Sequence, residues 1–171
     1  MAAWMQAHRP EVHWWCPQLP PSPREAMALL EDGLQDWPAA STGVIGSSLG
    51  GFYATAVAEH SGCRAVLLNP AIDPARDLAR YVGELTAWHG DEHFFFRAEF
   101  IAELRAISPA VLTLPARYFA VIAKGDELLS WVEMSERYRG CRIKLLEGSD
   151  HALSDFDEHL PEVTAFLGLS V

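Results

Sequence analysis

The chain has 171 residues, half of them hydrophobic, and its 23 acidic side chains outnumber 13 Lys and Arg, giving a formal net charge of −10. Such a length predicts one domain, residues 1–171, with a core of its own. An acidic chain lacks the basic stripe that nucleic-acid binding needs, and no apolar run approaches the ~20 residues of a membrane span. The three cysteines show neither metal spacing nor an even count, and no signal-peptide pattern opens the chain. We therefore expect a soluble, cytoplasmic protein.

Strand and helix patterns alternate along the chain, which predicts a parallel sheet with helices on its faces and places the chain in the α/β class. A first strand is expected at 12–16. A capping box from Ser22 to Glu25, with proline at the first helical position, then predicts a helix that ends near Gln35. Further strands are expected at 42–45, 64–68, 118–123 and 142–146, and further helices at 49–60, 129–138 and 154–167.

One excursion, 73–115, interrupts the alternation. It holds two amphipathic stretches and an aromatic cluster comprising Trp88, Phe94, Phe95, Phe96 and Phe100. As a cap over the sheet, it would line an acyl-binding pocket with Phe95 and Phe96; alternatively, these rings only pack the excursion onto the sheet. His89 and His93 have no third ligand at metal spacing, so we expect no metal site.

The run from Gly46 to Gly50 has the form G-x-S-x-G and contains Ser48. A short apolar strand precedes it and a small-residue helix follows it, which is typical of a nucleophile elbow. We expect side chains at 46 and 50 to collide in so sharp a turn, so that both positions need glycine. The N–H of Leu49, at the helix start, would donate to an oxyanion. The alternative is a Gly- and Ser-rich turn that merely reverses the chain.

A nucleophilic serine needs a histidine base that is held by a carboxylate. Of the seven histidines, only His151 falls in a loop between a strand and the helix that follows it. Asp126 follows the strand at 118–123, so both side chains are expected at the carboxyl edge of the sheet. Asp73 is the rival acid. Asp150 is a poor one, because a sequence neighbour rarely orients its own histidine.

Four short runs and one proline-rich segment carry a resemblance to a known family: 46–51, 68–71, 125–127, 148–152 and 17–21. With them the chain resembles the YqiA/YcfP-type esterases, small bacterial α/β hydrolases, over nearly its whole length. The resemblance implies an α/β-hydrolase-type three-layer sandwich with a mostly parallel sheet. It also implies hydrolysis of a carboxyl ester or thioester without a cofactor, with Ser48, Asp126 and His151 as the catalytic triad.

The chain departs from the family at its front. Family members begin with an apolar strand and a His-Gly-Phe type loop, which supplies the second N–H of the oxyanion hole. No such strand or loop precedes Ser48 here, so we expect either residues upstream of Met1 or a shortened form. Losing one oxyanion donor typically costs ~10²–10³ in rate, so we expect these residues alone to have weak or no activity. A sheet left open at that point would favour self-association.

The function expected from these residues is that of a serine hydrolase that cleaves small-molecule carboxyl esters through an acyl-enzyme. Two alternatives stay open: an acyl-CoA thioesterase, and a non-catalytic form that acts as a binding module. Asn69, at a strand end beside the elbow, either shapes the pocket floor or holds its own turn.

Overall fold

The computed structural model describes residues 1–86 and 93–169. Its main sheet has the strand order β1-β2-β5-β6, and every neighbouring pair in it is parallel. The strands are β1 (Gly43–Ser47), β2 (Arg64–Leu68), β5 (Tyr118–Ala123) and β6 (Arg142–Leu146). A separate antiparallel hairpin joins β3 (Gly83–Thr86) to β4 (His93–Phe96). Because all four strands of the main sheet are parallel, their carboxyl ends share one edge, where a site is expected in such sheets.

The two central strands are buried on both faces, which explains their continuous apolar sequences. Alternate side chains enter different cores. Leu67 and Ile122 belong to one cluster, whereas Val66 and Val121 belong to the other. This alternation follows from the two-residue period of a strand.

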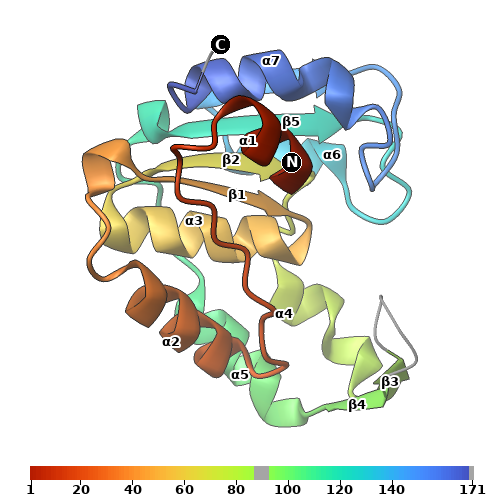
Figure 1. Ribbon diagram of the computed structural model, residues 1–171. Helices are drawn as coiled ribbons and strands as arrows, with labels where there is room; N and C mark the ends of the chain where they lie inside the picture. Colours follow the sequence, from red (N-terminus) through yellow and green to blue (C-terminus); the bar gives the residue numbers. More distant parts are fainter. Residues whose placement is uncertain (87–92, 170–171) are drawn as a thin grey trace.

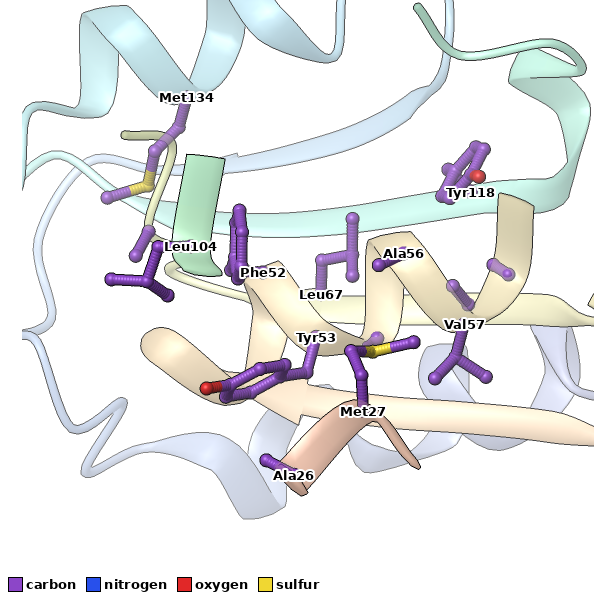
Figure 2. Close-up of a cluster of buried hydrophobic side chains, with 14 of the residues drawn as sticks. Ala26, Met27, Phe52, Tyr53, Ala56, Val57, Leu67, Leu104, Tyr118 and Met134 are labelled. Carbon is purple, nitrogen blue, oxygen red and sulfur yellow. The ribbon is translucent and has the colours of Figure 1, made fainter. Parts of the chain in front are cut away.

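Helices cover both faces of the sheet and so give three layers (Figure 1). The larger core lies between the sheet and α3, with α2 and α5 packed beyond it; Figure 2 shows its side chains, among them Phe52, Leu67 and Leu104. The smaller core lies under α7. The helices are α1 (Ala2–His8), α2 (Pro23–Leu34), α3 (Leu49–Ser61), α4 (Pro74–Asp77), α5 (Ala98–Ile107), α6 (Trp131–Arg137) and α7 (Phe156–Phe166). Short 3-10 turns lie at Ala39–Ser41, Ala79–Tyr81 and Pro115–Arg117.

The expected strand at 12–16 is wrong, because this segment forms no ladder with the sheet. The ring of Trp15 packs on a helix instead. A Cβ added at Gly33, in α2, would lie 2.2 Å from the ring of Trp15, and that ring is tilted against Trp37 at 6.4 Å between centroids. The segment is therefore held by aromatic packing, and β1 is the edge of the sheet as described.

The excursion folds as α4, the hairpin and α5. α5 is fastened to the start of α2, since the Glu103 carboxylate accepts hydrogen bonds from Ser22 Oγ at 2.8 Å and from the Arg24 N–H at 3.2 Å. Ser22 also caps α2 by accepting from the Glu25 N–H, as the capping box predicts. Trp88 and His89 lie outside the described residues. No helix in the described ranges has the length and hydropathy to span a bilayer.

Candidate active site

Ser48 occupies a strained turn between β1 and α3. Its backbone has φ +53° and ψ −121°, a region that a residue with a side chain rarely adopts. Three hydrogen bonds of 2.9 Å hold it there: its N–H donates to the Leu68 carbonyl, and its carbonyl accepts from the N–H groups of Gly51 and Ala71. The Ser48 hydroxyl does not cap α3, so it is free to face another element.

The glycines around Ser48 have different reasons to be glycine. A Cβ at Gly46 would lie 2.1 Å from the Gly50 carbonyl oxygen, and one at Gly51 would lie 2.7 Å from the Pro70 Cβ. A Cβ at Gly50 would meet no atom within 4 Å. The expected collision therefore occurs at position 46 and not at position 50, because position 50 opens onto the cavity beside the turn.

The structure brings three of the predicted side chains into one hydrogen-bonded row. His151 Nε2 lies 3.0 Å from Ser48 Oγ, and His151 Nδ1 lies 2.8 Å from Asp126 Oδ2. The Asp126 side chain is fully buried and that of His151 is 11% exposed. Because an ionised carboxylate only accepts, this geometry suits the tautomer of a neutral ring with its proton on Nδ1, which leaves Nε2 to accept from the serine hydroxyl.

The loop after β5 fixes the Asp126 carboxylate. Its second oxygen, Oδ1, accepts hydrogen bonds from the N–H groups of Leu128 and Leu129, both at 2.8 Å. Gly125 lets this loop approach the one that carries His151, since a Cβ there would lie 2.1 Å from the Ser149 carbonyl oxygen. Both oxygens of Asp126 are thus used, one on the imidazole and one on the main chain.

The two rival acids serve other groups. Asp73 caps α4, where its Oδ1 accepts from the Arg76 N–H at 3.0 Å. Asp150 accepts from Ser154 Oγ at 2.6 Å and from the Ser154 N–H at 2.9 Å. These hydrogen bonds hold the pKa of Asp150 below its ordinary value.

Asn69 is fully buried and adopts φ +41° directly after β2. Its amide group donates to the carbonyls of Asp150 and His151, and its Oδ1 accepts from the Ala123 N–H at 2.8 Å. Every one of these partners is a main-chain atom, so the geometry favours the structural alternative for Asn69 over a place in the pocket floor.

The Leu49 N–H, which the sequence predicts as an oxyanion donor, lies directly after Ser48 at the start of α3. It is the first helical N–H of α3, and no acceptor in the described part of the chain is hydrogen-bonded to it. The positive end of the helix dipole adds to this donor, because the first N–H groups of a helix have no partner within it.

A largely apolar cavity of about 550 Å³ lies between the edge strand β1 and the N-terminal segment, of which Met1, Met5 and residues 12–17 belong to its lining. Ser47, Gly50 and Ala152, which are sequence neighbours of the hydrogen-bonded row, belong to its lining. Phe96, one of the predicted pocket residues, does not. It is 5% exposed and packs edge-on against Phe100 at 5.5 Å between ring centroids. Phe95 lies in β4.

Comparisons with solved structures find α/β hydrolases. A protein from Agrobacterium vitis described as a hydrolase shares 16% identity, with 85% of this chain and 69% of that chain covered and a TM-score of 0.64. Mouse alpha/beta hydrolase domain-containing protein 10 shares 18% identity over 84% and 68%, with a TM-score of 0.59. Est1E from Butyrivibrio proteoclasticus, solved with ferulic acid, shares 20% over 84% and 64%, with a TM-score of 0.57. At these identities the likeness shows the fold alone, which is that of an α/β hydrolase.

The family comparison covers nearly all of the sequence. The profile of the uncharacterised protein family UPF0227 matches residues 1–168, which include both loops and the turn described above. The chain therefore belongs to UPF0227, the YqiA/YcfP-type family, and has the α/β-hydrolase fold.

Proposed function

We propose that this chain is a serine hydrolase that cleaves carboxyl esters of small molecules through an acyl-enzyme. One observation carries the proposal: the row from Ser48 Oγ through the His151 ring to the Asp126 carboxylate, with spacings of 3.0 and 2.8 Å. A nucleophile, a base and a group that orients the base, each within hydrogen-bond reach of the next, is the arrangement that acyl transfer by serine needs.

In the first half of the reaction, Ser48 Oγ attacks the ester carbonyl while His151 Nε2 takes the hydroxyl proton. Asp126 holds the ring and stabilises the imidazolium that forms. The Leu49 N–H donates to the oxyanion. The carbon–oxygen bond to the alcohol then breaks, the alcohol leaves with the proton from Nε2, and the acyl group remains on Ser48.

In the second half, His151 Nε2 takes a proton from a water molecule as that water attacks the acyl carbon. The bond to Ser48 Oγ breaks, the serine recovers its proton, and the carboxylic acid leaves. Every proton in the proposed reaction passes among Ser48, His151, the alcohol and water, so the reaction requires no cofactor. Because we assign a single backbone donor, Leu49, to the oxyanion, we expect slow turnover, about 10²–10³ below that of a site with two donors.

Hydrolysis of p-nitrophenyl acetate, butyrate and octanoate tests this proposal. Ser48→Ala should lose the enzymatic rate, by about 10³-fold or to the background of the uncatalysed reaction. Ser47→Ala is the matched control: it removes the neighbouring hydroxyl of the same turn and should leave most of the rate. Equal rates for wild type and Ser48→Ala, on all three esters, would reject the proposal.

A further inference from the structure

The segment from Leu68 to Ala71 joins the parts of the candidate active site. Its first carbonyl accepts from the Ser48 N–H, and its last N–H donates to the Ser48 carbonyl. Between them lies Asn69, whose own N–H donates to the Val121 carbonyl of β5 at 3.0 Å. The end of β2 is thus bonded to the elbow on one side and to the strand that leads to Asp126 on the other.

The Asn69 side chain extends this connection to the loop of His151. Asn69 is fully buried, yet both of its polar side-chain atoms have partners: Nδ2 lies 2.9 Å from the Asp150 carbonyl and 3.1 Å from the His151 carbonyl. Oδ1 accepts from Ala123, three residues before Asp126. One amide therefore fixes the end of β5 and the main chain of His151 relative to the elbow.

Glu127, in the loop after β5, also contacts the main chain of His151. Its Oε2 accepts the His151 N–H at 3.0 Å, while the adjacent Asp126 accepts from the imidazole. Hydrogen bonds within the loop, such as those that Asp150 accepts from Leu153 and Ser154, do not involve the main-chain N–H or carbonyl of His151. The position of the His151 main chain thus depends on side chains from two other loops.

We propose that Asn69 and Glu127 are positioning residues that set the place of the His151 ring relative to Ser48. The inference rests on the proposed hydrolase function, but neither residue has a role in the chemical steps. They act through the N–H of His151 and the carbonyls of Asp150 and His151. A shift of about 1 Å in a catalytic group costs up to 10²-fold in rate, so we expect these main-chain contacts to affect the rate although they do not touch the imidazole ring.

Glu127 gives the sharper test because its side chain is exposed, and its replacement leaves the core intact. Glu127→Ala should label Ser48 with a fluorophosphonate about 10-fold more slowly than wild type, and the His151 amide should exchange hydrogen faster. Glu127→Gln keeps an oxygen that accepts the His151 N–H and should label at nearly the wild-type rate. Glu136→Ala removes an exposed glutamate of α6 and should change neither readout.

Asn69→Asp tests the buried half of the proposal. Aspartate has the same shape, tolerates positive φ and still offers Oδ1 to Ala123, but at most one of the two carbonyls keeps a donor. We expect labelling of Ser48 to slow by about 10- to 100-fold, with the unfolding transition still cooperative in a thermal melt. Wild-type labelling by a folded Asn69→Asp protein would overturn the role of Asn69.

The outcomes separate this inference from the proposed function. If wild type labels at Ser48 and Glu127→Ala labels equally fast, the positioning role fails while the hydrolase stands. If Glu127→Gln is as slow as Glu127→Ala, charge and not the hydrogen bond is responsible, and the role assigned here is wrong. If wild type does not label at all, the hydrolase proposal fails. Exchange of the His151 amide, which needs no catalysis, then decides the positioning role alone: exchange unchanged in Glu127→Ala rejects it.

Discussion

At the scale of single residues, the two nitrogens of the His151 ring have different partners among the described residues: Nδ1 contacts the Asp126 carboxylate and Nε2 contacts the Ser48 hydroxyl. In the proposed mechanism this arrangement sets the tautomer, because Asp126 accepts from Nδ1 and Nε2 is left to receive the Ser48 proton. The pairing joins residues that are 25 and 103 positions apart in the chain, so the ring is oriented by the fold and not by its own loop.

Asp126→Asn should disable the base while keeping a side chain of the same shape. The amide that replaces the carboxylate can donate to Nδ1, which places the ring proton on Nε2, where the ring can no longer accept from the serine. We expect kcat for ester hydrolysis to fall by about 10³–10⁴-fold with a small change in KM. Asp73→Asn, at the rival acid that caps α4, should leave kcat unchanged. If instead Asp73→Asn lowers kcat and Asp126→Asn does not, the acid is misassigned.

At the scale of elements, the turn between β1 and α3 is held by a contact that admits no side chain. The two glycines of the motif make a matched pair, because a Cβ at Gly46 would overlap the Gly50 carbonyl at 2.1 Å and one at Gly50 would touch nothing. Gly46→Ala should lower the free energy of unfolding by about 3 kcal/mol, the upper end of the cost of overpacking. Gly50→Ala should leave it unchanged or raise it slightly. Urea denaturation measures both, and equal effects would contradict this geometry.

The loop that carries His151 should loosen in acid. Hydrogen bonds from Ser154 lower the pKa of Asp150 in the folded protein, so this carboxylate stabilises the fold above its unfolded pKa of about 3.9. That contribution is lost as the pH falls through the lower, folded pKa. In urea denaturation, the stability difference between wild type and Asp150→Asn should therefore shrink from about pH 6 to about pH 2. A difference that is constant over this range would show that the charge of Asp150 is not involved.

The sequence predicts most of these elements because their signals are local. The strands at 64–68, 118–123 and 142–146 have the bounds expected of them, since buried parallel strands are short apolar runs between turn residues. The segment 12–16 has a similar aromatic and β-branched pattern, yet its Trp15 ring packs on α2. Composition alone does not distinguish a side chain that faces a helix from one that lies in a sheet.

In the candidate site, too, the sequence signals some residues and not others. Ser48 and His151 can be picked from the sequence because each follows a strand in a recognisable context. Glu127 and Asn69 give no comparable signal for their contacts, which are made to main-chain atoms of a loop distant in sequence. Only the fold brings such partners together. Because every residue type offers the same main-chain atoms, the partner of such a side chain has no recognisable residue type in the sequence.

At the scale of the whole molecule, two apolar cores on opposite faces hold the sheet, and the site lies at the edge where its parallel strands end (Figure 1). β1 ends the sheet on one side, and the cavity of about 550 Å³ lies along it. An edge strand without a partner strand favours pairing with another chain, so self-association remains a prediction. Light scattering over a range of protein concentrations tests it, and a mass that stays monomeric throughout would reject it.

The proposed function depends above all on Ser48 being an activated nucleophile, and intact mass after incubation with a fluorophosphonate measures this without relying on turnover. The fluorophosphonate reacts once with an activated serine and stays attached, so the adduct accumulates even if the protein hydrolyses esters slowly. We expect one adduct per chain on the wild-type protein and none on Ser48→Ala. A folded wild-type protein that stays unmodified, or an adduct that persists in Ser48→Ala, would show that Ser48 is not the nucleophile.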